Sequence, residues 1–321
     1  MMMNCFKPAS FFIFCSLAMF SFFGCFKKKP APDNIETWLE IQFPGQFEVL
    51  HSNLNFNVMD MYRGKKTALV AEKSDPEVQF VLFWKKDSPD LGLTNEEVQT
   101  AFETAKNDVA QARDLFKLLK NKGLENFSVG VIEPAAYILI FTEPDAATRG
   151  QVLTKIKSAL DAKNTPTSIW IEMMEPSAYG QKFGDIIPHG HWKTETGWQE
   201  QEKIMSLNLE YRKEVSVATL MAHWEVNPMS RRGAADREDA YRQAKIWAEK
   251  NLPQPFYLEP NQMVGFETDE KDGLAVHYHF PYFDAQPNEN DSGLVEPKGY
   301  VSGLYHTEKK TFSAIKKQKD L

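Results

Sequence analysis

Residues Thr94–Gly123 have the sequence TNEEVQTAFETAKNDVAQARDLFKLLKNKG, which is the clearest helical pattern in the chain. Thr94 followed by Glu97 matches the capping box that begins many helices. Apolar side chains then recur at steps of four and three residues, on one face of a helix; they are Val98, Phe102, Ala105, Val109, Ala112, Phe116 and Leu119. Gly123 is the expected stop. This face could serve a coiled coil, but it spans few heptads, which favours packing on the chain's own sheet.

The segments on both sides of this helix predict strands. Glu77–Lys85 alternates apolar and polar residues, with Val78, Phe80, Leu82 and Trp84 on one face. Further strands are expected at residues 47–51, 67–73, 127–132, 137–142 and 167–173, and helices at residues 34–41 and 149–162. Strands and helices in this order indicate a sheet with helices on one face.

Residues 174–202 interrupt these patterns, because glycine and proline recur throughout the segment. We interpret it as a loop-rich connector between an N-terminal unit, residues 35–173, and a C-terminal unit, residues 203–321. In the second unit, strands are expected at residues 205–211, 215–226, 264–268, 274–282, 300–306 and 311–316, and a helix at residues 234–252. The sequence therefore predicts an α+β fold: mostly antiparallel sheets with long amphipathic helices packed on one face, in two units of similar size.

The N-terminus carries a second strong pattern. Residues Ala9–Gly24 are apolar and uncharged, and Lys7 is the only charge before them. This run of 16 residues is shorter than the about 20 that a spanning helix needs, and its length is close to that of a signal peptide. Cys25 follows the small residue Gly24, and Lys27–Lys29 follow in turn.

This arrangement resembles the export signal of bacterial lipoproteins. The resemblance implies that residues 1–24 are a signal peptide, cut before Cys25, and that the Cys25 thiol carries fatty acyl chains such as palmitate. Residues 25–34 would then be a basic, proline-containing tether. Phe22 stands where the family usually has an aliphatic residue, and an ordinary cleaved signal or a short uncleaved anchor are the alternatives. The expected location is the bacterial cell envelope, lipid-anchored to a membrane and facing the periplasm or the exterior.

The composition limits the classes of partner. The formal net charge is −7, and removal of residues 1–24 would make it −8. Because basic patches supply most of the affinity for nucleic acid, we expect no nucleic-acid partner. All three cysteines lie at or before Cys25, so the rest of the chain can form no disulfide and no cysteine-based metal site.

Four histidines are the residues most suited to chemistry. His277 and His279 flank Tyr278 in a predicted strand, so both imidazoles project from the same face. His189 and His191 flank Gly190 in the connector. Zinc takes three or four nitrogen, sulfur or oxygen ligands, which two such pairs could supply. A zinc-binding protein or metal-dependent hydrolase is therefore one hypothesis.

Sequence motifs of other enzyme classes are missing. The chain has no GxSxG nucleophile elbow, no Walker phosphate loop, no GxGxxG after a predicted strand and no HExxH helix. The sequence therefore favours a non-catalytic binding or scaffolding role at the membrane surface. An envelope protein is the expected macromolecular partner, and zinc remains the alternative.

Overall fold

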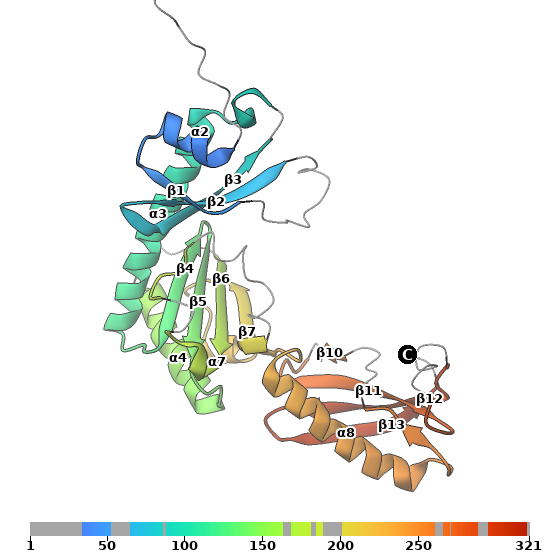
Figure 1. Ribbon diagram of the computed structural model, residues 1–321. Coiled ribbons are helices and arrows are strands. Elements are labelled where there is room, and N and C mark those ends of the chain that lie inside the picture. The colour runs from blue at the N-terminus through green and yellow to red at the C-terminus, as the bar shows by residue number, and fades with distance from the viewer. Residues whose placement is uncertain are drawn as a thin grey trace, which may run out of the picture.

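The computed structural model describes residues 34–52, 65–85, 88–162, 168–180, 184–188, 201–260, 266–269, 271–287 and 295–319. Cys25, the expected signal peptide and tether, His189 and His191 lie outside these ranges. Within the described part of the chain, no helix combines the length and the apolarity needed to cross a membrane. The described strands form three sheets, which follow one another in chain order along the molecule in Figure 1.

The first sheet, called here the N-terminal sheet, is an antiparallel meander in the order β1-β2-β3. Its strands are β1 (Phe47–Ser52), β2 (Lys66–Glu72) and β3 (Asp75–Trp84). Helix α2 (Ile35–Gln42) precedes them and begins at Asn34, whose side chain accepts a hydrogen bond from the backbone N–H of Thr37. A short 3-10 helix, η3 (Pro89–Gly92), leads from β3 to the long helix α3 (Asn95–Asn121).

The central sheet has the strand order β4-β5-β6-β7-β8. Its strands are β4 (Phe127–Ile132), β5 (Ala135–Phe141), β6 (Ser168–Met174), β7 (Lys203–Glu210) and β8 (Glu225–Val226). Among the described strand pairs, only β5 and β6 run parallel, and the crossover between them contains helix α4 (Ala146–Leu160). Helix α3 also packs against this sheet, and the short helices η4 (Pro176–Ala178) and α7 (Val217–Met221) follow β6 and β7 in the chain.

The C-terminal sheet has the antiparallel order β10-β11-β12-β13, with β9 also paired to β11. Its strands are β9 (Tyr257–Leu258), β10 (Phe266–Thr268), β11 (Ala275–Phe283), β12 (Gly299–His306) and β13 (Thr311–Gln318). Helix α8 (Arg231–Asn251) packs against β11, β12 and β13. The α+β prediction, with mostly antiparallel sheets and helices packed against them, is confirmed.

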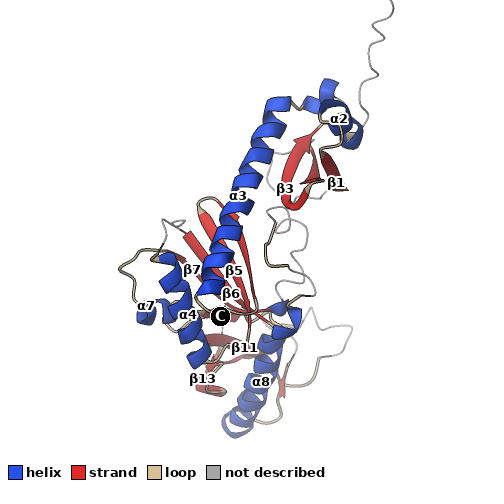
Figure 2. Cartoon of the chain, turned by 90° about the vertical axis from the view of Figure 1, so that its left-hand side faces the viewer, coloured by secondary structure: helices blue, strands red, loops and turns tan. Residues whose placement is uncertain are grey.

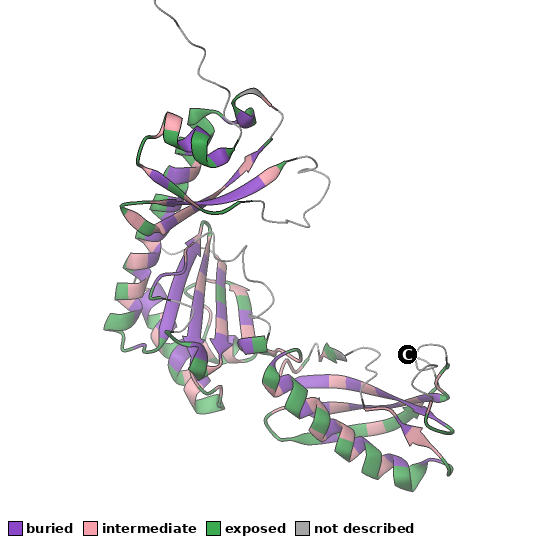
Figure 3. Cartoon of the chain, in the orientation of Figure 1, coloured by how far each residue is buried: buried purple, intermediate pink, exposed green. Residues whose placement is uncertain are grey.

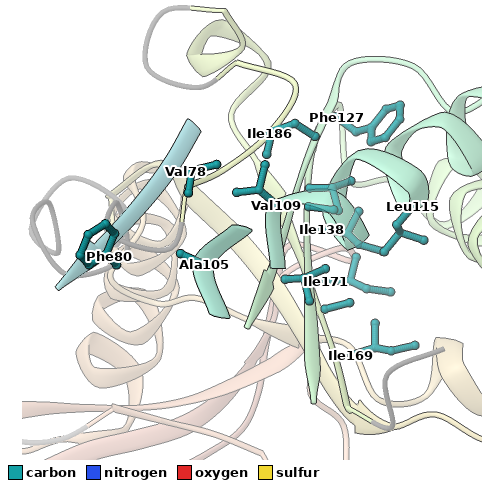
Figure 4. Close-up of a cluster of buried hydrophobic side chains, with 14 of the residues drawn as sticks. Val78, Phe80, Ala105, Val109, Leu115, Phe127, Ile138, Ile169, Ile171 and Ile186 are labelled. Carbon is teal, nitrogen blue, oxygen red and sulfur yellow. The ribbon is translucent and has the colours of Figure 1, made fainter. Parts of the chain in front are cut away.

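Two large apolar cores hold these layers together. One core is continuous from the N-terminal sheet through α3 to the central sheet, and the other lies between α8 and the C-terminal sheet. Figure 2 shows α3 running past both of the first two sheets, and Figure 3 shows buried residues along the strands of all three. In Figure 4, side chains from β3, α3 and the central sheet, including Phe80, Val109 and Ile138, belong to one cluster.

The sheets divide the chain at a different place from the expected boundary at residue 203. Strand β7 pairs with β6 along its length, so residues 203–226 belong to the central sheet. The glycine- and proline-containing segment before β7 also contacts this sheet, because Ile186 forms a parallel bridge with Val129. Residues 184–188 and 203–226 therefore lie with the sheet whose first strands belong to the predicted N-terminal unit.

The expected strand at residues 215–226 is wrong over most of its length. Residues Val217–Met221 form the short helix α7, and strand β8 is confined to Glu225–Val226. Ser216 caps α7 by accepting a hydrogen bond from the backbone N–H of Thr219 at 3.0 Å. Burial of Leu220 in the first core adds tertiary stabilisation, which outweighs the strand propensity of the valines and threonine here.

Candidate functional site

His277 and His279 lie on one face of β11, as the alternation predicts. They are opposite Leu304 and Ser302 of β12. The Nε2 atom of His277 lies 2.9 Å from Oδ2 of Asp269, and Nδ1 of His279 lies 2.8 Å from the hydroxyl of Ser302. Burial, followed by the neighbouring His277, lowers the pKa of His279, which favours its neutral form.

Both histidines line a shallow cavity of about 240 Å³ on this open face of the C-terminal sheet. Ser302, Lys316 and Gln318 contribute its other polar side chains. Within the part of the chain that the structure describes, no three His, Cys, Asp or Glu side chains come together as metal ligands. Because His189 and His191 lie outside that part, zinc binding by the four histidines stays a prediction.

A larger cavity, of about 450 Å³, lies between the central sheet and the C-terminal sheet with its helix α8. We call it the inter-sheet cavity. Residues from five segments line it, although not every residue of each segment does: the segments are residues 143–149 after β5, residues 204–205 of β7, residues 226–236 around the start of α8, residues 276–278 of β11, and residues 307–310 between β12 and β13. It therefore lies beside the carboxyl end of β5, one of the two parallel strands, which is where ligands bind in many parallel sheets.

Two arginines connect the sheets beside this cavity. Arg232 of α8 lies 2.7 Å from Glu143, which follows β5, and 2.8 Å from Glu175, which follows β6. The buried Arg149 of α4 lies 2.6 Å from Glu308, in the turn between β12 and β13. These ion pairs fix the C-terminal sheet against the ends of the central strands.

A fourth ion pair lies within the C-terminal part of the cavity. Nζ of Lys310 lies 2.5 Å from the Asp236 carboxylate. Burial raises the pKa of Asp236, and the ammonium of Lys310 opposes that rise. All three cations that line the cavity, Arg149, Arg232 and Lys310, are thus matched by carboxylates of the protein.

Two buried polar atoms of the cavity wall have no hydrogen-bond partner among the described residues. They are Nε of Arg149 and the hydroxyl of Tyr278. Arg149 is 2% exposed and Tyr278 is 1% exposed. An unpaired buried polar group costs about 1–3 kcal/mol, and more when the group is charged. A bound ligand that supplies the missing partners would recover part of that cost.

Sequence reasoning missed both residues. The alternating histidine pattern indicates His277 and His279, but the side chain of Tyr278 between them lies on the opposite face of β11 and lines the cavity. The alternating stripe Val276, Tyr278, Phe280 does place a hydroxyl among apolar side chains, which is a usable signal. No sequence pattern pairs Tyr278 with Arg149, because they lie far apart in the chain and line one cavity only in the fold.

Comparisons with known proteins give one structural similarity. No protein-family model matches the chain, and a search of curated proteins gives no match either. A crystal structure of a DUF5037 family protein from Ruminococcus gnavus is similar, at 11% sequence identity and a TM-score of 0.36. The alignment covers 59% of this chain and 96% of that chain. A similarity at this level supports no inference about function.

Proposed function

We propose that this protein is a non-catalytic binding protein, tethered to a membrane of the bacterial cell envelope, and that it binds a small molecule in the inter-sheet cavity. One observation carries the binding role: two residues of the cavity wall, Arg149 and Tyr278, each have a buried hydrogen-bonding atom without a partner in the described structure, Nε and the hydroxyl respectively. Its volume of about 450 Å³ also falls within the range of ordinary ligand pockets, about 300–1,000 Å³.

The ion pairs favour binding over catalysis. Arg232 is held by two carboxylates and Arg149 by one, and these contacts join two sheets. Charged groups that hold the architecture together are already neutralised by neighbours, so they are poorly suited to stabilise charge that develops on a substrate. The cavity is therefore better suited to bind a molecule through its shape and hydrogen bonds than to catalyse a reaction.

The membrane tether rests on the sequence around Cys25. One acyl chain gives marginal membrane binding, whereas two or more anchor a protein stably. Lys27–Lys29 would add attraction to anionic headgroups, about 1 kcal/mol for each lysine near the surface. We expect cells given labelled palmitate to incorporate the label into the wild-type protein and to retain that protein in the membrane fraction. Cys25→Ser should do neither, and equal labelling of both forms would overturn the tether.

Ligand binding can be tested with two neighbouring substitutions at the start of α4. Ala146 is exposed and lines the cavity, whereas Ala147 is exposed and is not among the described lining residues. Ala146→Trp should therefore obstruct the cavity, and Ala147→Trp serves as the matched control. Full-length protein in lipid nanodiscs is incubated with a small-molecule extract of bacterial envelopes and washed, and the retained molecules are identified by mass spectrometry. Wild type and Ala147→Trp should retain a molecule that Ala146→Trp loses; retention by all three, or by none, would refute the proposal.

The proposed non-catalytic role also includes scaffolding, in which the tethered protein binds another protein of the envelope. Its test is mild crosslinking in cells that express either the tethered protein or Cys25→Ser. A stoichiometric partner that depends on the tether supports scaffolding. Recovery of the protein alone, with crosslinking verified on a known complex, would refute it.

Zinc binding is the second candidate function, favoured by the shared cavity of His277 and His279. It predicts stoichiometric zinc in protein dialysed against zinc and then washed. His277→Ala should remove that zinc, and His223→Ala should retain it, because His223 lies on a different element and contacts the carbonyl of Thr219. Protein that takes up no zinc would exclude this function.

A further inference from the structure

We infer that the inter-sheet cavity takes an uncharged molecule with an apolar body and an acceptor oxygen, the oxygen lying between Arg149 and Tyr278. This inference rests on the proposed binding function and names its ligand class. Three properties of the cavity support this ligand class: the unpaired polar atoms of its lining residues, its charge balance and its apolar wall residues.

Arg149 supplies a donor that lacks an acceptor. One terminal nitrogen, Nη1, donates to the carbonyl of Pro144 at 2.5 Å and pairs with Glu308 at 2.6 Å. These contacts fix the orientation of the guanidinium. Its Nε atom has no partner in the described structure, and an arginine N–H can only donate. The ligand atom opposite Nε must therefore be an acceptor.

Tyr278 supplies the second unpaired group. Tyr278 lines the same cavity, and its buried hydroxyl has no partner within the described residues. Burial, with a further contribution from Asp236, raises the pKa of Tyr278, so the hydroxyl stays neutral and can donate a proton at physiological pH. One carbonyl or ether oxygen could accept from both Arg149 and Tyr278.

The charge balance of the wall disfavours an ionic ligand. Four carboxylates line the cavity, from Glu143, Asp145, Asp236 and Glu308, against the three cations described above. An anion would meet cations that are already paired and a lining with excess negative charge. A cation would compete for carboxylates that hold Arg149, Arg232 and Lys310, or for Asp145, which caps α4 through the backbone N–H of Thr148. An uncharged ligand avoids both costs.

Much of the remaining wall is apolar, although Asn227, Ser230 and Thr307 also line it. Ile204, Val226 and Val276 line the cavity from β7, β8 and β11. Burial of apolar ligand surface against them stabilises the complex by about 25 cal/mol per Å². The polar atoms and the apolar walls thus match two parts of a single amphipathic molecule.

The test uses three probes of nearly equal shape and different charge: benzamide, benzoate and benzylamine. Their binding to full-length protein in lipid nanodiscs is measured by isothermal titration calorimetry. Benzamide should bind at least about tenfold more tightly than benzoate, or than benzylamine in its ammonium form. Tyr278→Phe should weaken benzamide binding about five- to tenfold, the effect of one hydrogen bond.

Tyr282→Phe is the matched control. Tyr282 lies on the same strand and is 3% exposed, and its hydroxyl is also without a partner in the described structure, but it does not line the cavity there. This variant should bind benzamide like the wild type. Because neither hydroxyl holds a hydrogen bond in the described fold, neither substitution should unfold the protein.

Other outcomes separate the two proposals. Equal or tighter binding of benzoate or benzylamine, an unchanged affinity for benzamide in Tyr278→Phe, or no benzamide binding at millimolar concentration would each overturn the ligand class. The proposed binding function would survive any of these results if Ala146→Trp still abolished retention of the extracted molecule. If Ala146→Trp changed nothing, the binding function itself would fail.

Discussion

Gly233 shows how closely the backbone packs at the start of α8. A Cβ atom there would lie 2.3 Å from the carbonyl oxygen of Pro228 and 2.8 Å from that of Asn227. Both obstacles are backbone atoms, so a side chain can be accommodated only if the turn before α8 shifts. Gly233 also lines the inter-sheet cavity, which makes that turn part of the candidate site.

We therefore predict that Gly233→Ala lowers the free energy of unfolding by about 1–3 kcal/mol, the usual cost of overpacking. The control is Gly150→Ala in α4, where no atom lies within 4 Å of the added Cβ. It should raise stability by up to about 1 kcal/mol, because alanine favours a helix. Urea unfolding followed by circular dichroism measures both; a stable Gly233→Ala protein would show that the turn is adaptable.

Arg113 of α3 forms ion pairs with two carboxylates at the beginning of β3, those of Asp75 and Glu77. Its terminal nitrogens donate to both oxygens of Asp75 at 2.7 Å, and its Nε donates to Glu77 at 2.9 Å. The hydrogen bonds from Arg113 lower the pKa of Asp75 below its ordinary value of 3.8. A carboxyl whose pKa is lower in the folded state stabilises the protein above its unfolded pKa. That stabilisation disappears as the pH falls through the lower, folded value.

Arg113→Gln should therefore have a lower free energy of unfolding than wild type at neutral pH, and the difference should shrink as the pH falls below the unfolded pKa of about 4. Urea unfolding at a series of pH values checks this convergence. The control is Arg212→Gln, because the pair of Arg212 with Glu210 is largely exposed and should contribute little. If the difference in the free energy of unfolding between wild type and Arg113→Gln stayed constant with pH, the pH-dependent stabilisation could not come from Asp75.

At the scale of single elements, α3 follows its sequence signals closely. The Thr94 hydroxyl accepts a hydrogen bond from the Glu97 backbone at 3.1 Å, and the Glu97 carboxylate accepts one from the Thr94 backbone at 2.8 Å. The helix ends at Asn121, and Gly123 follows with a φ of +77°, a conformation that glycine adopts without strain. The capping box and the apolar face were both readable because they depend on neighbours within a few residues.

Thr94→Ala removes one half of the capping box, and it should lower the free energy of unfolding by about 1 kcal/mol, within a range of about 0.5–2. Thr104→Ala is the control within the same helix. Thr104 is exposed, and its hydroxyl bonds only to the carbonyl of Thr100. Alanine is the better helix former, so this variant should be as stable as wild type or slightly more stable. Equal losses in the two variants would argue against the cap.

Elements whose place depends on distant contacts were less predictable. Strand β7 has a clear alternation of Met205, Leu207 and Leu209, and the strand itself was predicted. Its partner β6 ends at Met174, well before β7 begins in the chain, and sequence alone does not tell which sheet a strand joins. Residues 217–221 show the same limit, because their helix depends on a local cap and on the burial of Leu220. The candidate cavity could not be predicted from the sequence for the same reason, because residues from five separate segments line it.

At the scale of the whole molecule, the two large cores indicate two cooperative units, although the strands form three sheets. One unit contains the N-terminal sheet, α3 and the central sheet, and the other contains α8 and the C-terminal sheet. Phe102 of α3 packs edge-on against Phe47 of β1, with ring centroids 5.2 Å apart, and Phe116 of the same helix stacks on Phe127 of β4 at 4.6 Å. One continuous helix thus contributes to the packing of two sheets. Loss of packing in either sheet should weaken the other through α3.

Hydrogen exchange measured by mass spectrometry can test this coupling with two core truncations, each expected to cost about 2–5 kcal/mol. Ile138 is fully buried in the core shared by the first two sheets, and Phe280 is fully buried in the core beneath α8. Ile138→Ala should speed exchange in β1–β3 as well as in the central sheet, because those strands unfold with α3. Phe280→Ala should speed exchange in α8 and β9–β13 while leaving β1–β3 unchanged. If Ile138→Ala affected only the central sheet, the N-terminal sheet would have independent stability, and α3 would be a linker between units instead of their shared core.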